Sequence, residues 1–417
     1  MLFSNIIYHD IDIIEYIEKD FKNRVENQNL MSGDNTQNIG SKGLTSEHVS
    51  RRAFVGAVGT ASIFGGTAVA KSSDTITIPY VKNGDEVLLW KEVPKSWYQQ
   101  VQQAKLAKKK VASEFLNQTG VIGVSRGRGK TTYGGKPGHR VHIHVDPDVF
   151  NGKSPGRVRG VNVKFVERDQ GELLNCVHYD DFDDVQGGIT NEAYWEEDDE
   201  GYIGVGTTCL RVGIDDEEND NHYMLTANHL WPDNCSESTN GITLQNGTQL
   251  GIVAGADVAT DIALTYKTND SKTLEDGIND ESFNWSVSGY YTESSVDDMY
   301  SEGRSNLRSM GVTTGLTQGA LDEIGFLGSG CLSYNGAGVI LDADGGEGDS
   351  GGPMYGLEEY FGSQWAVMLG VVSQGFYKKD TVSCTAGVAQ GNDRDVFHQH
   401  GGIGWHYLED NTSVTIS

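Results

Sequence analysis

The stretch Gly346-Glu-Gly-Asp-Ser-Gly-Gly-Pro353 decides the fold of this 417-residue chain. Glycines stand on both sides of Ser350, where they let the backbone turn sharply and pass close to another chain. A serine hydroxyl is a weak nucleophile at neutral pH, so it needs a base and a turn that exposes its oxygen. In such a turn the backbone N–H groups of Gly348 and Ser350 can converge on one developing negative charge. The stretch therefore predicts a nucleophile loop with an oxyanion hole.

A base and an orienting acid stand upstream of this loop. His229 lies at the end of the apolar run Tyr223–Leu230, and Asp261 lies within Ala259–Leu264. An incidental serine in a glycine-rich loop would need neither of them. Asp257 lies four residues before Asp261 and is the competing acid. Asp261 is preferred because apolar residues flank it and the acid of such a site is buried.

These motifs resemble those of chymotrypsin-like serine proteases. Thr226-Ala-Asn-His229 resembles the Thr-Ala-x-His element, and Asp261-Ile-Ala-Leu264 resembles the segment that carries the acid. The order histidine, aspartate, serine is also that of this family, whereas subtilisins and α/β-hydrolases use other orders. The resemblance implies that the serine attacks the scissile carbonyl while the histidine passes the proton to the leaving amine. The aspartate would hold the imidazole in the working tautomer.

Charge divides the chain into two parts. The whole chain has 59 Asp and Glu against 32 Lys and Arg, a net charge of −27. Residues 71–168 hold 18 basic and 8 acidic side chains, a net of +10, whereas residues 169–417 hold 8 and 43, a net of −35. So acidic a surface repels itself unless salt screens it, which favours a halophilic source over simple solubility. It also excludes nucleic acid as a partner, because phosphate would be repelled.

Residues 1–70 are predicted to be an N-terminal extension followed by a twin-arginine export signal. Ser50-Arg51-Arg52 precedes the small-residue apolar run Gly56–Ala70, which ends in an Ala-x-Ala cleavage site. This run is too short and too rich in glycine to span a bilayer comfortably. We therefore expect secretion without a stable membrane anchor. Translation is expected to start at Met31, with Met1 as the alternative, because signal n-regions are usually short.

Residues 71–175 are predicted to form a small α+β pro-domain. An apolar face at helical spacing predicts a helix over Trp97–Leu116. Three strands are expected after it, at Val121–Ser125, Arg140–Val145 and Val161–Val166. Secreted members of the resembled family often carry a propeptide that assists folding and blocks the active site. The resemblance therefore implies that this basic segment binds the acidic domain that follows.

Three histidines of this segment raise the question of a metal site. His142 and His144 fall on one face of a predicted strand, with His139 nearby. No cysteine or well-placed carboxylate completes a ligand set, and isolated strand histidines are mostly structural. The sequence therefore predicts no metal and no other cofactor. Calcium on so acidic a surface stays open, although no EF-hand loop is present.

Residues 176–417 are predicted to be the protease domain, an all-β, chymotrypsin-like double β-barrel. Val185-Gln-Gly-Gly-Ile189 resembles the opening of such a domain. Short apolar runs separated by turn residues support strands at Tyr202–Val205, Ile252–Ala254, Val339–Leu341 and Trp365–Val372. The segment Asp395–Leu408 is the one place where a helical period is suggested.

The residue that precedes the serine needs a partner in this family. In the digestive enzymes a freed amino terminus pairs with the residue equivalent to Asp349, but no basic residue immediately precedes Val185. The resemblance to bacterial members implies that an internal arginine takes this place. Arg308, just before the family-like segment Gly311–Gly315, is the preferred candidate; the alternatives are Arg304 and Arg394.

Substrate binding is assigned by the same resemblance. Asp344 lies six residues before Ser350, at the place where trypsin-like enzymes keep an acid at the base of the primary pocket. It would favour Lys or Arg in the substrate; the alternative is one more surface acid. Gly370-Val-Val-Ser-Gln-Gly375 resembles the strand that binds the substrate backbone, with Ser373 and Gly375 offering polar contacts.

Five cysteines in an exported chain suggest disulfides and one leftover thiol. Cys209 and Cys235 bracket the histidine loop as the family's pair does, so the resemblance implies that they are joined. Cys331 with Cys384 is a weaker assignment, which leaves Cys176 unpaired. No cysteine lies in a motif with a histidine, so a catalytic cysteine is not expected.

The leading interpretation is a secreted serine endopeptidase that acts on proteins or peptides as a monomer. The first alternative is a catalytically silent binding protein on the same fold. It is disfavoured because the histidine, the aspartate and the serine of the triad and the oxyanion glycine are all present. The second alternative is an esterase that uses the same triad, which the predicted peptide-binding strand disfavours.

Overall fold

The fold is described from a computed structural model that covers most of residues 74–416. Residues left outside this description are 1–73, 154, 168–171, 174–183, 198–199, 215–221, 232–240, 246, 281–282, 330–331, 361, 384–392 and 417. The predicted export signal and both candidate start sites fall in the first of these ranges and therefore stay predictions. None of the helices in the described part of the chain is both long and apolar enough to cross a membrane.

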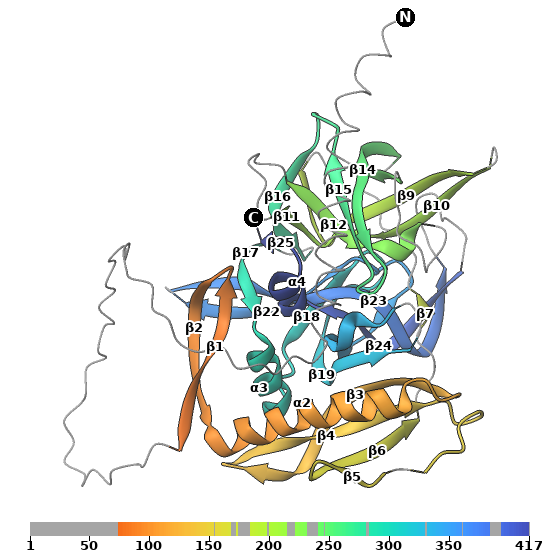
Figure 1. Ribbon diagram of the computed structural model, residues 1–417. Helices are drawn as coiled ribbons and strands as arrows, with labels where there is room; N and C mark the ends of the chain where they lie inside the picture. The colour runs from red at the N-terminus through yellow and green to blue at the C-terminus, as the bar shows by residue number, and fades with distance from the viewer. Residues whose placement is uncertain are drawn as a thin grey trace, which may run out of the picture.

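Six antiparallel strands close into a barrel near the centre of the molecule (Figure 1). In order around the ring they are β18 (Leu307–Gly311), β19 (Gly315–Gly328), β20 (Gly338–Asp342), β24 (Asp393–Gly404), β23 (Ser363–Ser383) and β22 (Pro353–Tyr360). The last of these pairs with β18 again, at Arg308 with Tyr355 and Ser309 with Met354. The ring encloses buried side chains such as Leu341 and Val372.

A second sheet of eight antiparallel strands packs above this barrel (Figure 1). Its order is β10 (Glu200–Thr207), β9 (Thr190–Glu197), β13 (Ile242–Gln245), β14 (Thr248–Asp257), β15 (Ile262–Lys267), β12 (Tyr223–Ala227), β11 (Leu210–Ile214) and β25 (Val414–Ile416). The C-terminal strand β25 thus belongs to this eight-stranded sheet, where it pairs with β11. The predicted all-β double barrel is confirmed, and we call residues 184–416 the barrel unit.

Short elements connect and flank the two barrels. They are β8 (Asp184–Gly187), β16 (Thr273–Asn279), β17 (Asn284–Tyr291), α3 (Glu293–Glu302), β21 (Gly345–Gly346) and α4 (Trp405–Asn411). The helix α3 begins where the Thr292 side chain accepts a hydrogen bond from the Ser295 backbone N–H, and it ends at Gly303, whose φ is +69°. The suggested helix over Asp395–Leu408 is wrong for most of its length, because β24 runs to Gly404 and only then does α4 begin.

Residues 74–173 form what we call the N-terminal unit, whose helix and longer strands lie below the barrel and whose first hairpin stands beside β17 (Figure 1). It contains β1 (Thr75–Asn83), β2 (Glu86–Pro94), α2 (Lys95–Phe115), β3 (Val121–Tyr133), β4 (Lys136–Val145), β5 (Arg157–Val158), β6 (Val161–Glu167) and β7 (Glu172–Leu173). The predicted helix and three strands are confirmed, because α2 packs across β3 and β4 through a core that includes Ala104, Val111 and Ile143. The hairpin of β1 and β2 is absent from the sequence prediction.

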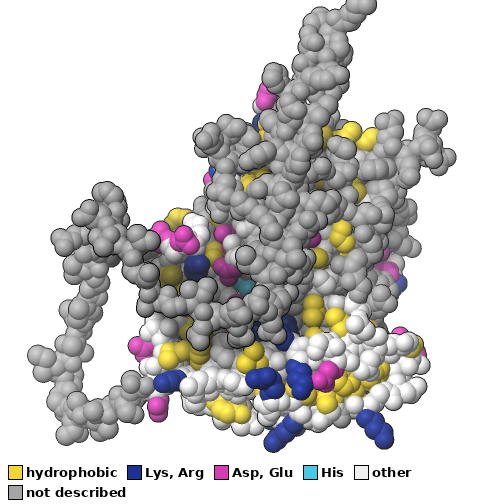
Figure 2. Space-filling view, viewed as in Figure 1, with side chains coloured by type: hydrophobic (Ala, Val, Ile, Leu, Met, Phe, Trp, Pro, Cys, Tyr) yellow, Lys and Arg dark blue, Asp and Glu magenta, His cyan; other side chains and the backbone are white. Residues whose placement is uncertain are grey.

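The N-terminal unit and the barrel unit share strand pairings. Strand β1 pairs with β17 at Val81 with Tyr291, and β3 pairs with β19 at Arg126 with Ile324. Val81 also packs in one buried cluster with Tyr291 and Val339 of the barrel unit. On the face shown in Figure 2, Lys and Arg side chains gather over the lower part of the molecule, where α2 lies. The basic charge counted in the sequence therefore lies in the N-terminal unit.

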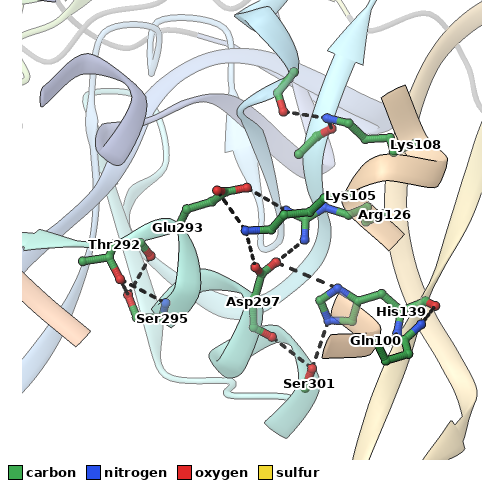
Figure 3. Close-up of polar contacts among 12 residues, drawn as sticks. Gln100, Lys105, Lys108, Arg126, His139, Thr292, Glu293, Ser295, Asp297 and Ser301 are labelled. Atoms are coloured by element: carbon green, nitrogen blue, oxygen red, sulfur yellow. Dashed lines mark hydrogen bonds and ion pairs between the residues drawn. The ribbon is translucent and has the colours of Figure 1, made fainter. Parts of the chain in front are cut away.

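Helix α3 is gripped by cations of the N-terminal unit (Figure 3). The Asp297 carboxylate, 1 % exposed, pairs with Lys105 at 2.9 Å and with Arg126. Burial opposes the ionisation of Asp297, but the charges of Arg126 and Lys105 outweigh it and hold the pKa of its carboxyl well below its usual range. Asp298 beside it pairs with Lys91 at 2.6 Å. Buried carboxylates of α3 thus pair with basic side chains of the N-terminal unit.

One lysine of α2 is held without any carboxylate. Lys108 is 7 % exposed, and its Nζ donates to the backbone carbonyls of Gly325 and Gly336 at 2.7 Å each. Burial lowers the pKa of Lys108 to about 7, helped by the nearby positive charge of Arg126. Figure 3 shows this side chain reaching from α2 to the barrel unit. Charge complementarity alone therefore does not account for the contact, since polar backbone groups are also recruited.

Candidate active site

His229 lies at the end of β12, where the chain leaves the upper sheet. The buried run Tyr223–Ala227 is followed by one turn of 3₁₀ helix, Asn228–Leu230, which contains the histidine. His229 is 4 % exposed. Its Nδ1 donates to Asp261 Oδ2 at 2.6 Å, and its backbone N–H donates to Asp261 Oδ1 at 2.9 Å. With Nδ1 carrying the proton, Nε2 of the neutral ring is left as the basic nitrogen.

Asp261 is placed by the tight turn between β14 and β15. Its φ is +60°, in the left-handed region that aspartate tolerates better than most residues. The competing acid, Asp257, accepts hydrogen bonds from the backbone N–H groups of Ala259 and Thr260, at 3.2 Å each, and so serves this turn. The structure thus brings Asp261, and not Asp257, to the histidine.

Ser350 lies in the lower barrel, between the short strand β21 and β22. Gly348 and Gly351 on its two sides have φ values of +110° and +88°, which require glycine. A Cβ at Gly351 would also lie 2.2 Å from the Thr207 carbonyl oxygen. The Ser350 Oγ donates to the Ser373 carbonyl at 3.2 Å, so the hydroxyl rests on β23 in this structure. His229 Nε2 is buried and has no hydrogen-bond partner among the described residues.

The segment Gly311–Gly315 holds the nucleophile loop. The buried carboxylate of Asp349 accepts from the backbone N–H of Thr313 at 2.9 Å and from the backbone N–H and hydroxyl of Thr314 at 3.2 and 2.5 Å. The Gly346 N–H adds a fourth bond at 2.7 Å. Burial raises the pKa of the Asp349 carboxyl, and these hydrogen bonds oppose that rise. Four uncharged donors therefore satisfy this carboxyl.

The expected arginine partner of Asp349 is wrong. Arg308, the preferred candidate, pairs with Asp280 at 3.0 Å, and the alternative Arg304 pairs with Glu358. Arg394 has a buried Nε without a hydrogen-bond partner and makes no described pair with Asp349. Thr313 and Thr314 bond the Asp349 carboxylate where an arginine had been expected, because their short loop brings its donors directly to that carboxylate.

The predicted specificity residue does not lie free in a pocket. The Asp344 side chain is 40 % exposed, and its Oδ2 pairs with Lys379 Nζ at 2.5 Å. This arrangement favours the alternative of a surface acid over a pocket base. Gly375 lies on β23 opposite His400 of β24. His400 is buried, and its Nδ1 donates to the Ala343 carbonyl, 2.9 Å away.

Ser373 contributes to the triad as well as to the substrate strand. Its hydroxyl donates a short hydrogen bond to Asp261 Oδ2, and it accepts one from the Tyr334 hydroxyl at 2.9 Å. Tyr334, Ser373, Asp261 and His229 are thus linked by hydrogen bonds, with the Asp261 carboxylate accepting from both Ser373 and His229. Sequence reasoning missed Tyr334, because a buried tyrosine in an irregular stretch carries no motif. The side chain predicted to contact substrate is instead used to orient the acid.

A strand from the N-terminal unit lies along the expected substrate strand. The short strand β7 pairs antiparallel with β23, with Leu173 opposite Gln374 and Glu172 opposite Gly375. The Tyr377 hydroxyl also donates to the Glu167 carbonyl at 3.3 Å. Antiparallel addition to an exposed strand edge is a common way to bind an extended peptide. The chain that precedes the barrel unit thus occupies the edge at Gln374 and Gly375.

The structure describes only one of the two cysteines in the predicted disulfide. Cys209 is buried beside β11, and burial raises the pKa of its thiol well above the usual value. Its expected partner Cys235 lies outside the described residues, as do Cys176, Cys331 and Cys384. Both cysteine pairings therefore stay predictions.

Comparison with known proteins adds a similarity of fold. No protein-family model matches the chain, and no curated protein matches it. Solved structures that resemble it include Thermobifida fusca protease A (16 % identity, TM-score 0.32) and a Cellulomonas bogoriensis chymotrypsin (15 %, 0.34), each matched over 56 % of this chain and 97 % of its own. A glutamic acid-specific serine protease matches over 56 % of this chain and 100 % of its own, at 17 % identity and a TM-score of 0.35. At these identities the similarity concerns the fold alone. The chain's own strand pairings show two barrel-like antiparallel sheets, and the fold assignment rests on those pairings.

Proposed function

We propose that the barrel unit is a serine endopeptidase. The observation that carries this proposal is the double hydrogen bond between Asp261 and His229, which fixes both the position and the tautomer of the imidazole. Ser350 stands in the glycine turn of the other barrel, so the site lies where the two barrels meet. A fixed imidazole with its basic nitrogen uncommitted is what a serine nucleophile requires.

The reaction would follow the order of the triad. Ser350 Oγ turns from the Ser373 carbonyl to His229 Nε2 and loses its proton as it attacks the scissile carbonyl. The imidazolium that forms is stabilised by Asp261 and then protonates the leaving amine. Water later attacks the acyl-enzyme, with the same nitrogen acting as base. Nothing beyond these three side chains and the loop backbone is needed for either proton transfer.

The oxyanion is assigned to the backbone N–H groups of Gly348 and Ser350. The Thr313 hydroxyl donates to the Glu347 carbonyl at 2.5 Å. In a trans peptide the C=O and the N–H point in opposite directions, so this bond also fixes the direction of the Gly348 N–H. Donors that are fixed before the reaction stabilise a developing charge better than donors that must reorient.

We further propose that the N-terminal unit is a pro-segment that keeps the enzyme latent. Strand β7 covers the edge of β23 at Gln374 and Gly375, where an extended substrate would otherwise pair. Release of the strand, by cleavage between residues 174 and 184, would open that edge. The test compares the fluorophosphonate labelling rate of the intact chain with that of the cleaved enzyme. Equal rates would contradict latency and leave the triad proposal untouched.

Export and salt adaptation complete the proposal. The paired arginines at residues 51–52 support secretion in a folded state, and the net charge of −27 supports a salty medium. Peptidase assays are therefore best run in multimolar salt. Asp344 assigns no preference for Lys or Arg in the substrate, because it pairs with Lys379 at the surface.

Active-site labelling tests the enzyme directly. Purified protein, freed of residues 74–173, is treated with a fluorophosphonate in high salt and read by intact mass. One adduct is expected on the wild type and on the control Ser363→Ala, which changes an exposed hairpin serine, and none on Ser350→Ala. No adduct on folded protein would favour the silent binding protein. Turnover of a simple ester without turnover of any peptide would favour the esterase.

A further inference from the structure

Four buried polar side chains meet where the N-terminal unit joins the barrel unit. His142 and His144 alternate along β4 and therefore share a face, and β3 lies between β4 and β19. Ser125 comes from β3 and Glu323 from β19. The four are between 0 and 6 % exposed. Two imidazoles, a hydroxyl and a carboxylate thus lie together in the interior, contributed by both units.

The polar atoms of this cluster converge on one point. His142 Nδ1 lies 2.6 Å from Glu323 Oε1, and Ser125 Oγ lies 2.5 Å from Glu323 Oε2 and 2.8 Å from His144 Nε2. One ligand atom each from His142, His144 and Glu323 can be chosen so that all lie within 4.8 Å of one another. Ligands of a single zinc ion stand roughly 3–3.5 Å apart, because each bond is about 2 Å long. Shifts of about 1 Å or less would convert the present spacing into that of a coordination sphere.

Neighbouring residues pack closely around this cluster. A Cβ at Gly127 would lie 1.9 Å from Cε1 of His142, so glycine is needed there for the ring to fit. The ring of Phe326 packs 5.5 Å from that of His144, which is fully buried. His142 Nε2 is buried without a hydrogen-bond partner among the described residues. Strong ion–ligand attraction is expected in so dry a setting.

We propose that this cluster binds one divalent transition-metal ion of the zinc type. His142 Nδ1, His144 Nε2 and the Glu323 carboxylate are the protein ligands, with the Ser125 hydroxyl or a water in the fourth position. Two imidazoles and one carboxylate suit zinc, whereas calcium and magnesium prefer oxygen ligands alone. Binding replaces the hydrogen bonds between these groups, so the ion takes the place of the proton on each ligating nitrogen.

The sequence hides this site for a simple reason. His142 and Glu323 are 181 residues apart, and the carboxylate that contacts His142 comes from β19 of the barrel unit. Because the ligands come from both units, a bound ion would tie the N-terminal unit to the barrel unit. Anything that binds only the joined state stabilises it by mass action. This inference does not rest on peptidase activity, since it concerns the attachment of the two units.

The test uses the full chain carrying Ser350→Ala, which cannot cleave itself. Protein stripped with a chelator is titrated with Co²⁺, whose visible absorption reports tetrahedral nitrogen and oxygen ligands, and bound metal is counted by elemental analysis. One Co²⁺ per chain, displaced by Zn²⁺, is expected, together with a rise in the melting temperature. Glu323→Gln keeps the size of the side chain and should weaken binding at least about tenfold. His398→Gln changes an exposed histidine and should not weaken it.

Three outcomes would overturn the proposal. The first is the absence of bound metal on folded wild-type protein, which would leave a hydrogen-bonded cluster without an ion. The second is unchanged binding in Glu323→Gln, and the third is a loss in His398→Gln, which would place the metal at the surface. Should Glu323→Gln fail to fold, His144→Gln repeats the test. The first outcome holds without any variant.

Discussion

Asp261 holds His229 through two separate hydrogen bonds, one from the backbone N–H at 2.9 Å and one from Nδ1 at 2.6 Å. The first fixes where the histidine stands and the second fixes which nitrogen carries the proton. Because both bonds end on one carboxylate, the loop between β14 and β15 and the end of β12 move as one piece. The imidazole therefore has no freedom to choose the other tautomer.

Replacing Asp261 by asparagine should keep the fold and lower kcat for a peptide substrate by about 10⁴. The amide presents a donor to Nδ1, so the ring adopts the wrong tautomer. The matched control is Asp257→Asn, which alters a carboxylate of the same turn that bonds Ala259 and Thr260. It should leave kcat within about tenfold of wild type. An equal loss in both variants would mean that the turn, and not the tautomer, is what matters.

Thr313→Val tests the support of the oxyanion loop. It removes the hydroxyl that holds the Glu347 carbonyl and keeps the backbone N–H that serves Asp349. We expect kcat to fall by about 10² with little change in KM, because the lost interaction concerns the transition state. Thr317→Val is the control, since its buried hydroxyl has no described hydrogen-bond partner. A rise in KM alone would refute this role.

Asp297→Asn tests the grip of the N-terminal unit on α3. The change leaves Lys105 and Arg126 near a neutral amide, so the free energy of unfolding should fall by about 3–5 kcal/mol. The exposed pair of Asp276 with Arg211 provides the control, because Asp276→Asn should cost less than about 1 kcal/mol. Denaturant unfolding of chains carrying Ser350→Ala measures both. Similar values would show that the buried pair adds nothing.

Stability should fall on acidification because of the same helix. The charges of Lys105 and Arg126 hold the pKa values of Asp297 and Glu293 below their usual range against the effect of burial, and His139 also faces the Asp297 carboxylate. Such a depressed pKa contributes stability that is complete above the unfolded value of about 4 and is lost as the pH falls further. The melting temperature should thus drop steeply below about pH 4. A shallower drop is expected in Asp297→Asn, and an identical one would exclude this pair as the cause.

Much of the fold was readable because its signals are local. The order and setting of His229, Asp261 and Ser350 predicted an all-β double barrel by resemblance, and apolar runs predicted strands such as those within β20 and β23. The helix Trp97–Leu116 was visible from its apolar face and lies within two residues of α2 at each end. Each of these patterns depends on a few neighbouring residues, which is what a sequence displays.

Pairings between distant residues were not readable. Arg308 was assigned to Asp349 by resemblance to bacterial proteases, yet Arg308 pairs with Asp280, and Asp349 is bonded by Thr313 and Thr314. Asp344 was counted into a pocket by its distance from Ser350, but Lys379 on β23 draws it to the surface. The carboxylate that joins His142 and His144 comes from β19. Which polar group meets which depends on strand register, and register is a property of the whole sheet.

The pairing of β1 with β17 also bears on the time course of folding. Val81 leaves the ribosome long before Tyr291, its partner in the sheet, and β3 likewise waits for β19. Chains dominated by contacts between distant residues fold slowly, because long loops must close before those contacts form. During synthesis, the first hundred residues of the structure therefore have strand edges and lysine side chains whose partners have not yet been made. Their native partners become available only when most of the chain has been made.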